Sequence, residues 1–210
     1  MLKGKMKMTR NDQENFWSQT YSKDYIKKNS NFDNKLLFQG WEKLLAKIEN
    51  PLSILECGAN IGRNIKALDF FLPNAKKSAI EISSDAAEIL KKNYPSLNIF
   101  NQSILESSFQ KDEFDFVFTM TVLIHINPKD LNKVYKNMYN LSKKFILIAE
   151  YFSQDPVVIK YRGKNNLLFK RDFAKEIKNK YNLKIVDYGF IWSEDKKHSL
   201  DNFNWFILKK

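Results

Sequence analysis

The stretch Ile54-Leu55-Glu56-Cys57-Gly58-Ala59-Asn60-Ile61-Gly62-Arg63-Asn64 carries the strongest structural signal in the chain. A short apolar run leads to an acid, then to two glycines four residues apart, then to a helical pattern, which predicts a strand, a tight turn and a helix. Because glycine lacks a Cβ, Gly58 and Gly62 allow a left-handed backbone and the close approach of a ligand. The turn should also present free N–H groups at a helix N-terminus, so we expect a small, polar, nucleoside-containing ligand there. The alternative is a plain strand-to-helix turn.

Short apolar runs alternate with helical patterns on both sides of this stretch. Such alternation predicts right-handed βαβ units and a parallel sheet. No helical pattern separates the last two apolar runs, so the sheet should end in an antiparallel hairpin. We expect strands at 52–57, 77–82, 97–100, 114–119, 145–151, 183–190 and 203–208, and helices at 34–48, 61–72, 86–94, 128–141 and 171–181.

The predicted fold is α/β, with a seven-strand Rossmann-like sheet that is mostly parallel, has its last strand antiparallel and carries helices on both faces. Residues 51–210 form the ligand-binding domain, and residues 1–50 form an N-terminal aromatic and helical cap that is integral to it. Four aromatic residues between positions 16 and 25 indicate either a short helix packed on the sheet or a cap that closes over a ligand. Residues 152–169 are expected to be irregular.

Composition limits the class of protein. The 210 residues fit one domain, and the single cysteine, Cys57, excludes a disulfide within the chain and favours a cytoplasmic protein. No apolar stretch approaches the roughly 18 residues of a membrane span, and the basic start lacks the apolar core of a secretory signal. The net charge of +11 favours anionic partners, but the lysines are spread along the chain, which argues against nucleic acid.

Polar residues follow several predicted strands, at the edge where sheets of this kind bind ligands. Glu81 ends the second strand, where a carboxylate can accept hydrogen bonds from both hydroxyls of a ribose. Ser103 and Ile104 follow the third strand and suit an adenine ring. A dinucleotide fingerprint would need glycine at 60 and 63, and a P-loop would need Gly-Lys-Ser/Thr, so neither motif is present.

The spacing acid-x-Gly-x-Asn-x-Gly at Glu56–Gly62 resembles the first motif of class I S-adenosylmethionine-dependent methyltransferases, with Asn60 at the middle glycine. Asparagine tolerates a left-handed backbone better than most residues. The resemblance covers about residues 50–210. A further set of segments resembles the pseudaminic acid biosynthesis-associated methylases: Phe16-Trp17, Tyr25-Ile26, Ile54–Gly62, Val122–Pro128, Tyr161–Gly163, Phe169–Ala174 and Asp187–Phe190.

This resemblance implies a methyltransferase that uses S-adenosyl-L-methionine, without a metal. Gly58, Asn60 and Gly62 would approach the methionine part of the cofactor. Glu81 would hold the ribose, and Thr119 would lie under the sulfonium. The full expected cofactor-binding set is Trp17, Tyr25, Glu56, Gly58, Ala59, Asn60, Gly62, Arg63, Asn64, Glu81, Ile82, Ser103, Ile104, Thr119 and Met120.

His125 is the best candidate for a general base, because imidazole titrates near neutral pH and this residue follows the fourth strand. The alternative is a packed histidine at the start of a helix. Tyr151, after the fifth strand, is the second catalytic candidate. The candidate substrate-binding residues come from segments that would cover the site, where arginine could hold a carboxylate or phosphate; they are Tyr161, Arg162, Lys170, Arg171 and Asp172.

The resemblance implies a small acceptor, either sugar-derived or a nucleotide-activated sugar, in nonulosonic (pseudaminic) acid or surface-glycan biosynthesis. Two other functions stay open. The net charge is compatible with an RNA methyltransferase, and the fold is compatible with a protein that binds the cofactor without catalysis. Positions 170–172 could also be just the charged start of a helix. The oligomeric state is not set by the sequence.

Overall fold

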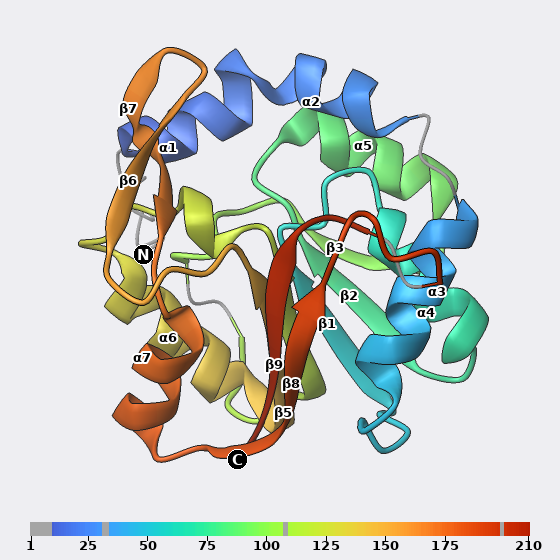
Figure 1. The fold of residues 1–210 in the computed structure, drawn as a ribbon. Helices are drawn as coiled ribbons and strands as arrows, with labels where there is room; N and C mark the ends of the chain where they lie inside the picture. The colour runs from blue at the N-terminus through green and yellow to red at the C-terminus, as the bar shows by residue number, and fades with distance from the viewer. Residues whose placement is uncertain (1–9, 31–33, 107–108, 198–199) are drawn as a thin grey trace, which may run out of the picture.

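A seven-stranded sheet forms the centre of the computed structural model, which describes residues 10–30, 34–106, 109–197 and 200–210 (Figure 1). Its order is β3-β2-β1-β4-β5-β9-β8. Strands from β3 to β5 run parallel, and β9 runs antiparallel to both of its neighbours. The strands are β1 (Ser53–Cys57), β2 (Lys76–Ile80), β3 (Asn98–Phe100), β4 (Phe114–Met120), β5 (Ser142–Glu150), β8 (Lys184–Ile191) and β9 (Phe203–Lys209).

Helices cover both faces of this sheet, so the predicted fold class is confirmed. One apolar core packs α3, α4 and α5 against one face, and a second packs α6 and α7 against the other. β4 separates them, because Phe116 and Phe118 belong to the first core and Val117 to the second. The helices are α3 (Asn34–Leu45), α4 (Arg63–Phe71), α5 (Ser84–Asn93), α6 (Leu131–Leu141) and α7 (Phe173–Tyr181).

Several helices are shorter than the sequence predicts, and local hydrogen bonds explain two of the differences. The helix expected from 128 begins at Leu131, because the Asn127 side chain accepts the N–H of Lys129 and forms a turn first. The helix expected from 171 begins at Phe173, because the Asp172 carboxylate accepts the N–H of Lys175 as an N-cap. Local side-chain acceptors thus set these helix starts.

The N-terminal segment is helical, as expected. It comprises α1 (Asp12–Asn15), a π-helix η1 (Phe16–Thr20) and α2 (Ser22–Asn29). A capping box starts it, in which the Asn11 side chain accepts the N–H of Glu14 and the Glu14 carboxylate accepts the N–H of Asn11. Residues 1–9 of the expected cap lie outside the described residues. In Figure 1 this blue segment runs across the upper side of the molecule, beside the orange hairpin described next.

The segment 152–169, expected to be irregular, instead forms most of a second, two-stranded sheet. β6 (Val157–Tyr161) pairs antiparallel with β7 (Lys164–Lys170). Arg162 and Gly163 both have positive φ, at 52° and 77°, as a tight hairpin turn requires. Leu167 packs with Phe16 and Tyr21 of the N-terminal segment. Because the hairpin packs on that segment and not on the main sheet, its strands lack the apolar alternation that would have predicted them.

Among the helices of the described residues, none has both the length and the apolar character needed to cross a bilayer. The same residues contain no cluster of three or more histidine, cysteine or carboxylate side chains that could hold a metal ion.

Candidate active site

A pocket of about 430 Å³ lies at the carboxyl ends of β1, β2 and β4, under the N-terminal segment. This is where the strand order reverses, between β1 and β4, and doubly wound sheets bind their ligands there. The volume is within the range of pockets for small ligands. Many residues of the expected site line it: Trp17, Tyr25, Glu56, Gly58, Ala59, Asn60, Arg63, Asn64, Glu81, Ile82, Ser103, Ile104, Met120, His125, Tyr151 and Tyr161.

The turn after β1 has three residues in the left-handed region: Gly58 at φ 84°, Asn60 at φ 47° and Gly62 at φ 86°. Asparagine therefore does occupy the conformation that the middle position of the motif requires. The N–H groups of Gly58 and Ala59 both donate to the carbonyl of Ile80 in β2, at 2.8 and 3.1 Å. These two N–H groups are thus hydrogen-bonded to the neighbouring strand. They are not the free donors that the sequence predicted.

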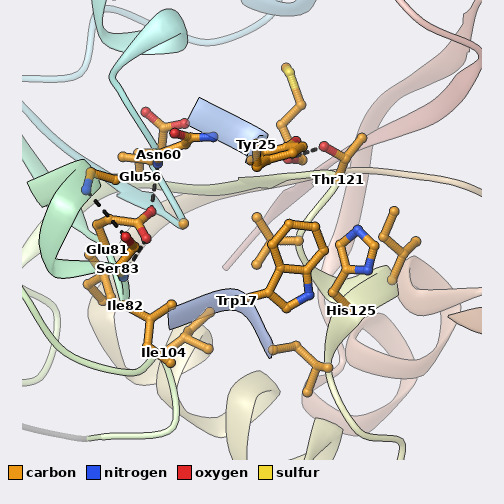
Figure 2. Close-up of a pocket in the computed structure, with 18 of the residues that line it drawn as sticks. Trp17, Tyr25, Glu56, Asn60, Glu81, Ile82, Ser83, Ile104, Thr121 and His125 are labelled. Carbon is orange, nitrogen blue, oxygen red and sulfur yellow. Dashed lines mark hydrogen bonds between the residues drawn. The ribbon is translucent and has the colours of Figure 1, made fainter. Parts of the chain in front are cut away.

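Glu81 ties the end of β2 to this turn. Its Oε2 accepts the N–H of Asn60 and its Oε1 accepts the N–H of Ser83, each at 2.7 Å (Figure 2). Burial raises the pKa of this carboxyl, and the backbone N–H groups oppose the rise. Ser83, the N-cap of α5, also shares a hydrogen bond with Ser22 of α2. Glu81 therefore presents a fixed carboxylate in the pocket, where the N-terminal segment meets the sheet.

Glu56, at the end of β1, is 1 % exposed and is held by a chain of two side chains, the first from α4 and the second from α3. The Asn64 Nδ2 donates to its Oε1 at 2.6 Å, and the Asn64 Oδ1 accepts the indole N–H of Trp41 at 3.0 Å. Its Oε2 has no hydrogen-bond partner in the described part of the chain. Burial, with the charge of Glu81 adding to it, raises the pKa of Glu56 to about 8. Trp41 was not among the expected site residues.

The other end of the pocket is aromatic (Figure 2). The ring of Trp17 lies 4.3 Å from that of His125 and 5.1 Å from that of Tyr25, between centroids. Tyr161 of β6 lies 5.5 Å from His125. Four rings from the N-terminal segment, η2 (Leu123–His125) and the hairpin thus form one wall. Such a wall offers apolar faces and excludes water.

His125 has one defined hydrogen bond, between its Nδ1 and the carbonyl oxygen of Leu167 at 2.7 Å. A carbonyl oxygen only accepts, so Nδ1 must carry the hydrogen and Nε2 must carry the lone pair in the neutral ring. Burial lowers the pKa of His125 to about 4, although the hydrogen bond to Leu167 opposes this. The imidazole is therefore neutral at physiological pH and can accept a proton at Nε2.

Glu150, at the end of β5, supports the segment that carries His125. Its buried carboxylate accepts the N–H groups of Val122 and Leu123, both at 3.0 Å, and that of Ile124 at 3.4 Å. These are the unpaired donors at the start of η2. Burial raises the pKa of Glu150 to about 7, against those hydrogen bonds. The sequence marks Glu150 only as the end of a strand, and its role depends on the β4–β5 pairing.

Removing this carboxylate should be costly to stability. We expect Glu150→Ala to lower the free energy of unfolding by about 2–5 kcal/mol, because several buried N–H groups lose their acceptor. Glu150→Gln keeps one acceptor oxygen and should lose less. Urea denaturation at neutral pH measures both. An alanine variant as stable as the parent would show that these donors have other partners.

Two expected cofactor residues are placed elsewhere. Gly62 does not line the pocket, because a Cβ there would lie 2.5 Å from the Tyr94 ring and 2.8 Å from a methyl group of Leu90. Its lack of a side chain serves the packing of α4 on α5. Thr119 is fully buried in β4 and also does not line the pocket, whereas Thr121, just beyond the strand, does. Thr121, and not Thr119, therefore brings a threonine side chain to the pocket wall.

All four expected substrate-binding charges, Arg162, Lys170, Arg171 and Asp172, lie outside the pocket wall, whereas Tyr161 lines it. The guanidinium of Arg162 lies 4.6 Å from the ring centroid of Tyr21 and donates to the Tyr21 hydroxyl. Arg171 pairs with Glu176 at 2.6 Å. These contacts hold the hairpin on the N-terminal segment and fix the start of α7. Asp172 is the N-cap described above, which matches the alternative of a charged helix start.

Tyr151 lines the pocket but is not a free phenol. Its hydroxyl donates to Asp201 at 2.6 Å, and the ammonium of Lys170 lies 5.3 Å from its ring centroid. Burial, together with the neighbouring carboxylate, raises the pKa of Tyr151. The phenol therefore stays protonated at physiological pH, and it orients Asp201, a pocket residue that the sequence did not single out.

Residues 54–144 match the family model described as "Methyltransferase domain". Residues 54–144 are therefore similar to a methyltransferase domain. The matched segment runs from Ile54 in β1 to Lys144 near the start of β5 and includes the acids at the ends of β1 and β2. An uncharacterized protein of Methanocaldococcus jannaschii is 29 % identical over 137 residues, which are 63 % of this chain and 57 % of that protein. The chain thus spans little more than half the length of this relative.

Solved structures show the same fold. A S-adenosylmethionine-dependent methyltransferase of Leishmania major matches with a TM-score of 0.72 at 18 % identity, covering 94 % of this chain and 81 % of that one. A 1,6-didemethyltoxoflavin-N1-methyltransferase of Burkholderia thailandensis, solved with S-adenosylhomocysteine and its acceptor, matches with a TM-score of 0.70 at 13 % identity, covering 96 % and 92 %. At 18 % and 13 % identity these structures show the fold, and together with the match of residues 54–144 they support the expected enzyme class and its cofactor, S-adenosyl-L-methionine.

Proposed function

We propose that this chain is a S-adenosylmethionine-dependent methyltransferase that acts on a small, sugar-derived acceptor in nonulosonic (pseudaminic) acid or surface-glycan biosynthesis. One observation supports the enzymatic part of this proposal. Two buried carboxylates, Glu56 and Glu81, lie beside a turn whose N–H groups already have hydrogen-bond acceptors within the protein. A phosphate-binding turn would leave its N–H groups free for an anion. Acids at this point instead favour a ligand with positive charge and hydroxyl groups, as in S-adenosylmethionine.

The residues present fit this cofactor. Glu81 offers carboxylate lone pairs to the two ribose hydroxyls, and the side-chain oxygens Oε2 of Glu56 and Oδ1 of Asn60 are buried without partners among the described residues. These acceptors suit the ammonium group of the methionine part. Ile82 and Ile104 line the pocket beside Glu81 (Figure 2), and Ser103 also lines it. These residues supply the surface for an adenine ring. When bound, the cofactor supplies a methyl group on positively charged sulfur.

The aromatic wall has two tasks in this proposal. It excludes water and aligns the acceptor, and most of the catalysis of methyl transfer consists of such alignment. The Nε2 of His125 then accepts the proton that an acceptor hydroxyl oxygen loses as its bond to carbon forms. A low proton affinity at His125 is sufficient, since a hydroxyl oxygen that gains a bond to carbon becomes strongly acidic.

A sugar-derived acceptor is supported by the resemblance to the pseudaminic acid-associated methylases and by the wall of Trp17, Tyr25 and Tyr161, whose faces can pack on the apolar face of a sugar ring. Arg162 and Arg171, which were expected to hold a phosphate or carboxylate, are engaged elsewhere. This favours an acceptor sugar without a bound nucleotide over a nucleotide-activated one.

Cofactor binding is the first test. Calorimetry should show S-adenosylhomocysteine binding to the purified protein, and Glu81→Ala should weaken it about 10- to 100-fold, because charged hydrogen bonds of roughly 1.5–3 kcal/mol are lost. Glu88→Ala, an exposed acid on α5, is the matched control and should bind like the parent. Absence of binding in the parent protein would refute the proposal. Binding without methyl transfer to any amino sugar or sugar nucleotide would instead indicate a non-catalytic protein.

A further inference from the structure

Gln13 of α1 is a buried polar residue whose side chain joins three segments of the molecule. It is 4 % exposed and lines the pocket. Its Nε2 donates to the carbonyl oxygen of Asn166 in β7 at 2.6 Å. Its Oε1 accepts a side-chain N–H of Asn127, two residues beyond His125, at 3.3 Å. One amide therefore ties the N-terminal segment to the hairpin and to the loop after η2.

These two contacts flank the hydrogen bond that orients His125. Asn166 directly precedes Leu167, whose carbonyl oxygen takes the hydrogen of His125 Nδ1. Asn127 belongs to the loop that continues from His125. Gln13 therefore bonds both to the loop that follows the donor, His125, and to the strand that contains the acceptor, Leu167. It keeps these two segments aligned. Both of its own hydrogen bonds are buried or partly buried, where such bonds are costly to lose.

We propose that Gln13 is a positioning residue through which the N-terminal segment holds His125 in the tautomer whose Nε2 lone pair is free. The inference rests on the proposed function, because that function gives His125 its role as proton acceptor. A neutral imidazole carries its hydrogen on one nitrogen only. The carbonyl of Leu167 selects Nδ1–H while β7 lies beside η2, which it contacts directly, and the Gln13 amide adds a hydrogen-bonded link between β7 and the loop after η2.

The same segment also packs on the other side of the imidazole. Trp17 follows Gln13 by four residues, and its ring lies 4.3 Å from that of His125. Glu150 holds η2 from the sheet side and has no contact with the hairpin among its hydrogen bonds. The backbone of His125 is therefore placed by the sheet, whereas its ring and its tautomer are set by the docked N-terminal segment. The Nε2 of His125 would be ready to accept a proton only when the N-terminal segment is docked.

Nitrogen-15 NMR of imidazole reads this tautomer without knowledge of the acceptor. The chain has two histidines, so His198→Asn leaves His125 as the single imidazole. In that background the parent, Gln13→Met and Gln13→Glu are compared at neutral pH, each saturated with S-adenosylhomocysteine. We expect a protonated Nδ1 and an unprotonated Nε2 in the parent. In both variants, which cannot donate to Asn166, the ratio of the Nδ1–H to the Nε2–H form should fall about three- to tenfold.

Two further variants sharpen the result. Asn15→Ala removes an exposed contact on the same helix, to the Arg10 carbonyl, and should leave the spectrum unchanged. Asn127→Ala removes one partner of Gln13 without touching the N-terminal segment and should shift the ratio in the same direction by a smaller factor. Unchanged spectra in the Gln13 variants, with S-adenosylhomocysteine still bound, would overturn the inference. If the tautomer depends on Gln13 but the protein does not bind S-adenosylhomocysteine, the positioning role is upheld and the proposed function is refuted.

Discussion

Glu56→Gln is expected to weaken binding of S-adenosylmethionine about 10- to 100-fold and to remove the pH dependence of that binding. The buried Oε2 of Glu56 has no partner among the described residues, so a cationic ligand group would pair with it directly. Charged hydrogen bonds are worth roughly 1.5–3 kcal/mol, and an isosteric amide keeps the shape while removing the charge. The Asn64 N–H can still donate to the remaining oxygen.

The pH dependence has a definite sign. The pKa of Glu56 in the free protein is about 8, and a bound cation favours its ionised form. Below pH 8 the carboxyl must release a proton on binding, so the association constant should fall by up to about tenfold per pH unit. Above pH 8 it should level off. Calorimetry in buffers of different ionisation enthalpy counts the released protons, and Glu88→Gln serves as control. Binding that is independent of pH in the parent would contradict the expected protonation of Glu56.

The same group should make the free protein less stable as pH rises. A carboxyl whose folded pKa of about 8 exceeds its ordinary value of 4.5 holds a proton that the unfolded chain has lost between those two values. Stability is therefore full below about pH 4.5 and declines until about pH 8, by roughly 3–5 kcal/mol from this group. Glu56→Gln removes that decline, although one amide N–H stays unpaired. Above pH 8 we expect the variant to melt at a higher temperature than the parent, while binding less cofactor.

The centre of the main sheet could be predicted from the sequence because its central strands are buried on both faces. The run 145–149 is apolar throughout, which favours a strand buried on two faces. The hairpin β6–β7 was not predicted, because residues of its first strand are partly exposed. Val157, Val158 and Ile159 are each more than a third exposed, so no alternation marks the strands. Its stability comes from contacts with the N-terminal segment, which lies more than a hundred residues away in sequence.

The sequence signal that best predicted site residues was their position at the carboxyl end of a predicted strand. Glu81 and Gly58 could be identified because the carboxyl ends of parallel strands converge. Residues whose role depends on partners far away in the sequence could not be identified in this way. Trp41 reaches Glu56 only because α3 packs on the sheet, and Gln13 reaches His125 only because the N-terminal segment docks against the hairpin. Gly62 stays a predicted cofactor residue, and the structure adds a packing role that its motif did not indicate, since a side chain there would meet α5.

Gly58→Ala should strongly destabilise the motif turn, because it combines a left-handed alanine with a steric clash against Val122. Gly58 has φ 84°, and a Cβ there would lie 2.6 Å from Cγ2 and 3.1 Å from Cγ1 of Val122. Gly163, in the hairpin turn, provides a matched control, because it has φ 77° but a Cβ there would meet no atom within 4 Å. The difference between the two alanine variants therefore isolates the contact with Val122 from the cost of the left-handed backbone.

We expect Gly163→Ala to lower the free energy of unfolding by about 1–2 kcal/mol, the cost of a left-handed alanine. Gly58→Ala should lose about 1–3 kcal/mol more, because the branched side chain of Val122 is fixed on a loop held by Glu150 and can yield little. Urea denaturation measures both, and calorimetry should show that only Gly58→Ala impairs binding of S-adenosylhomocysteine. Val122→Ala, added to Gly58→Ala, should restore most of the additional loss. Equal effects of the two glycine substitutions, or no rescue, would show that backbone conformation alone governs this turn and that its contact with the loop after β4 is unimportant.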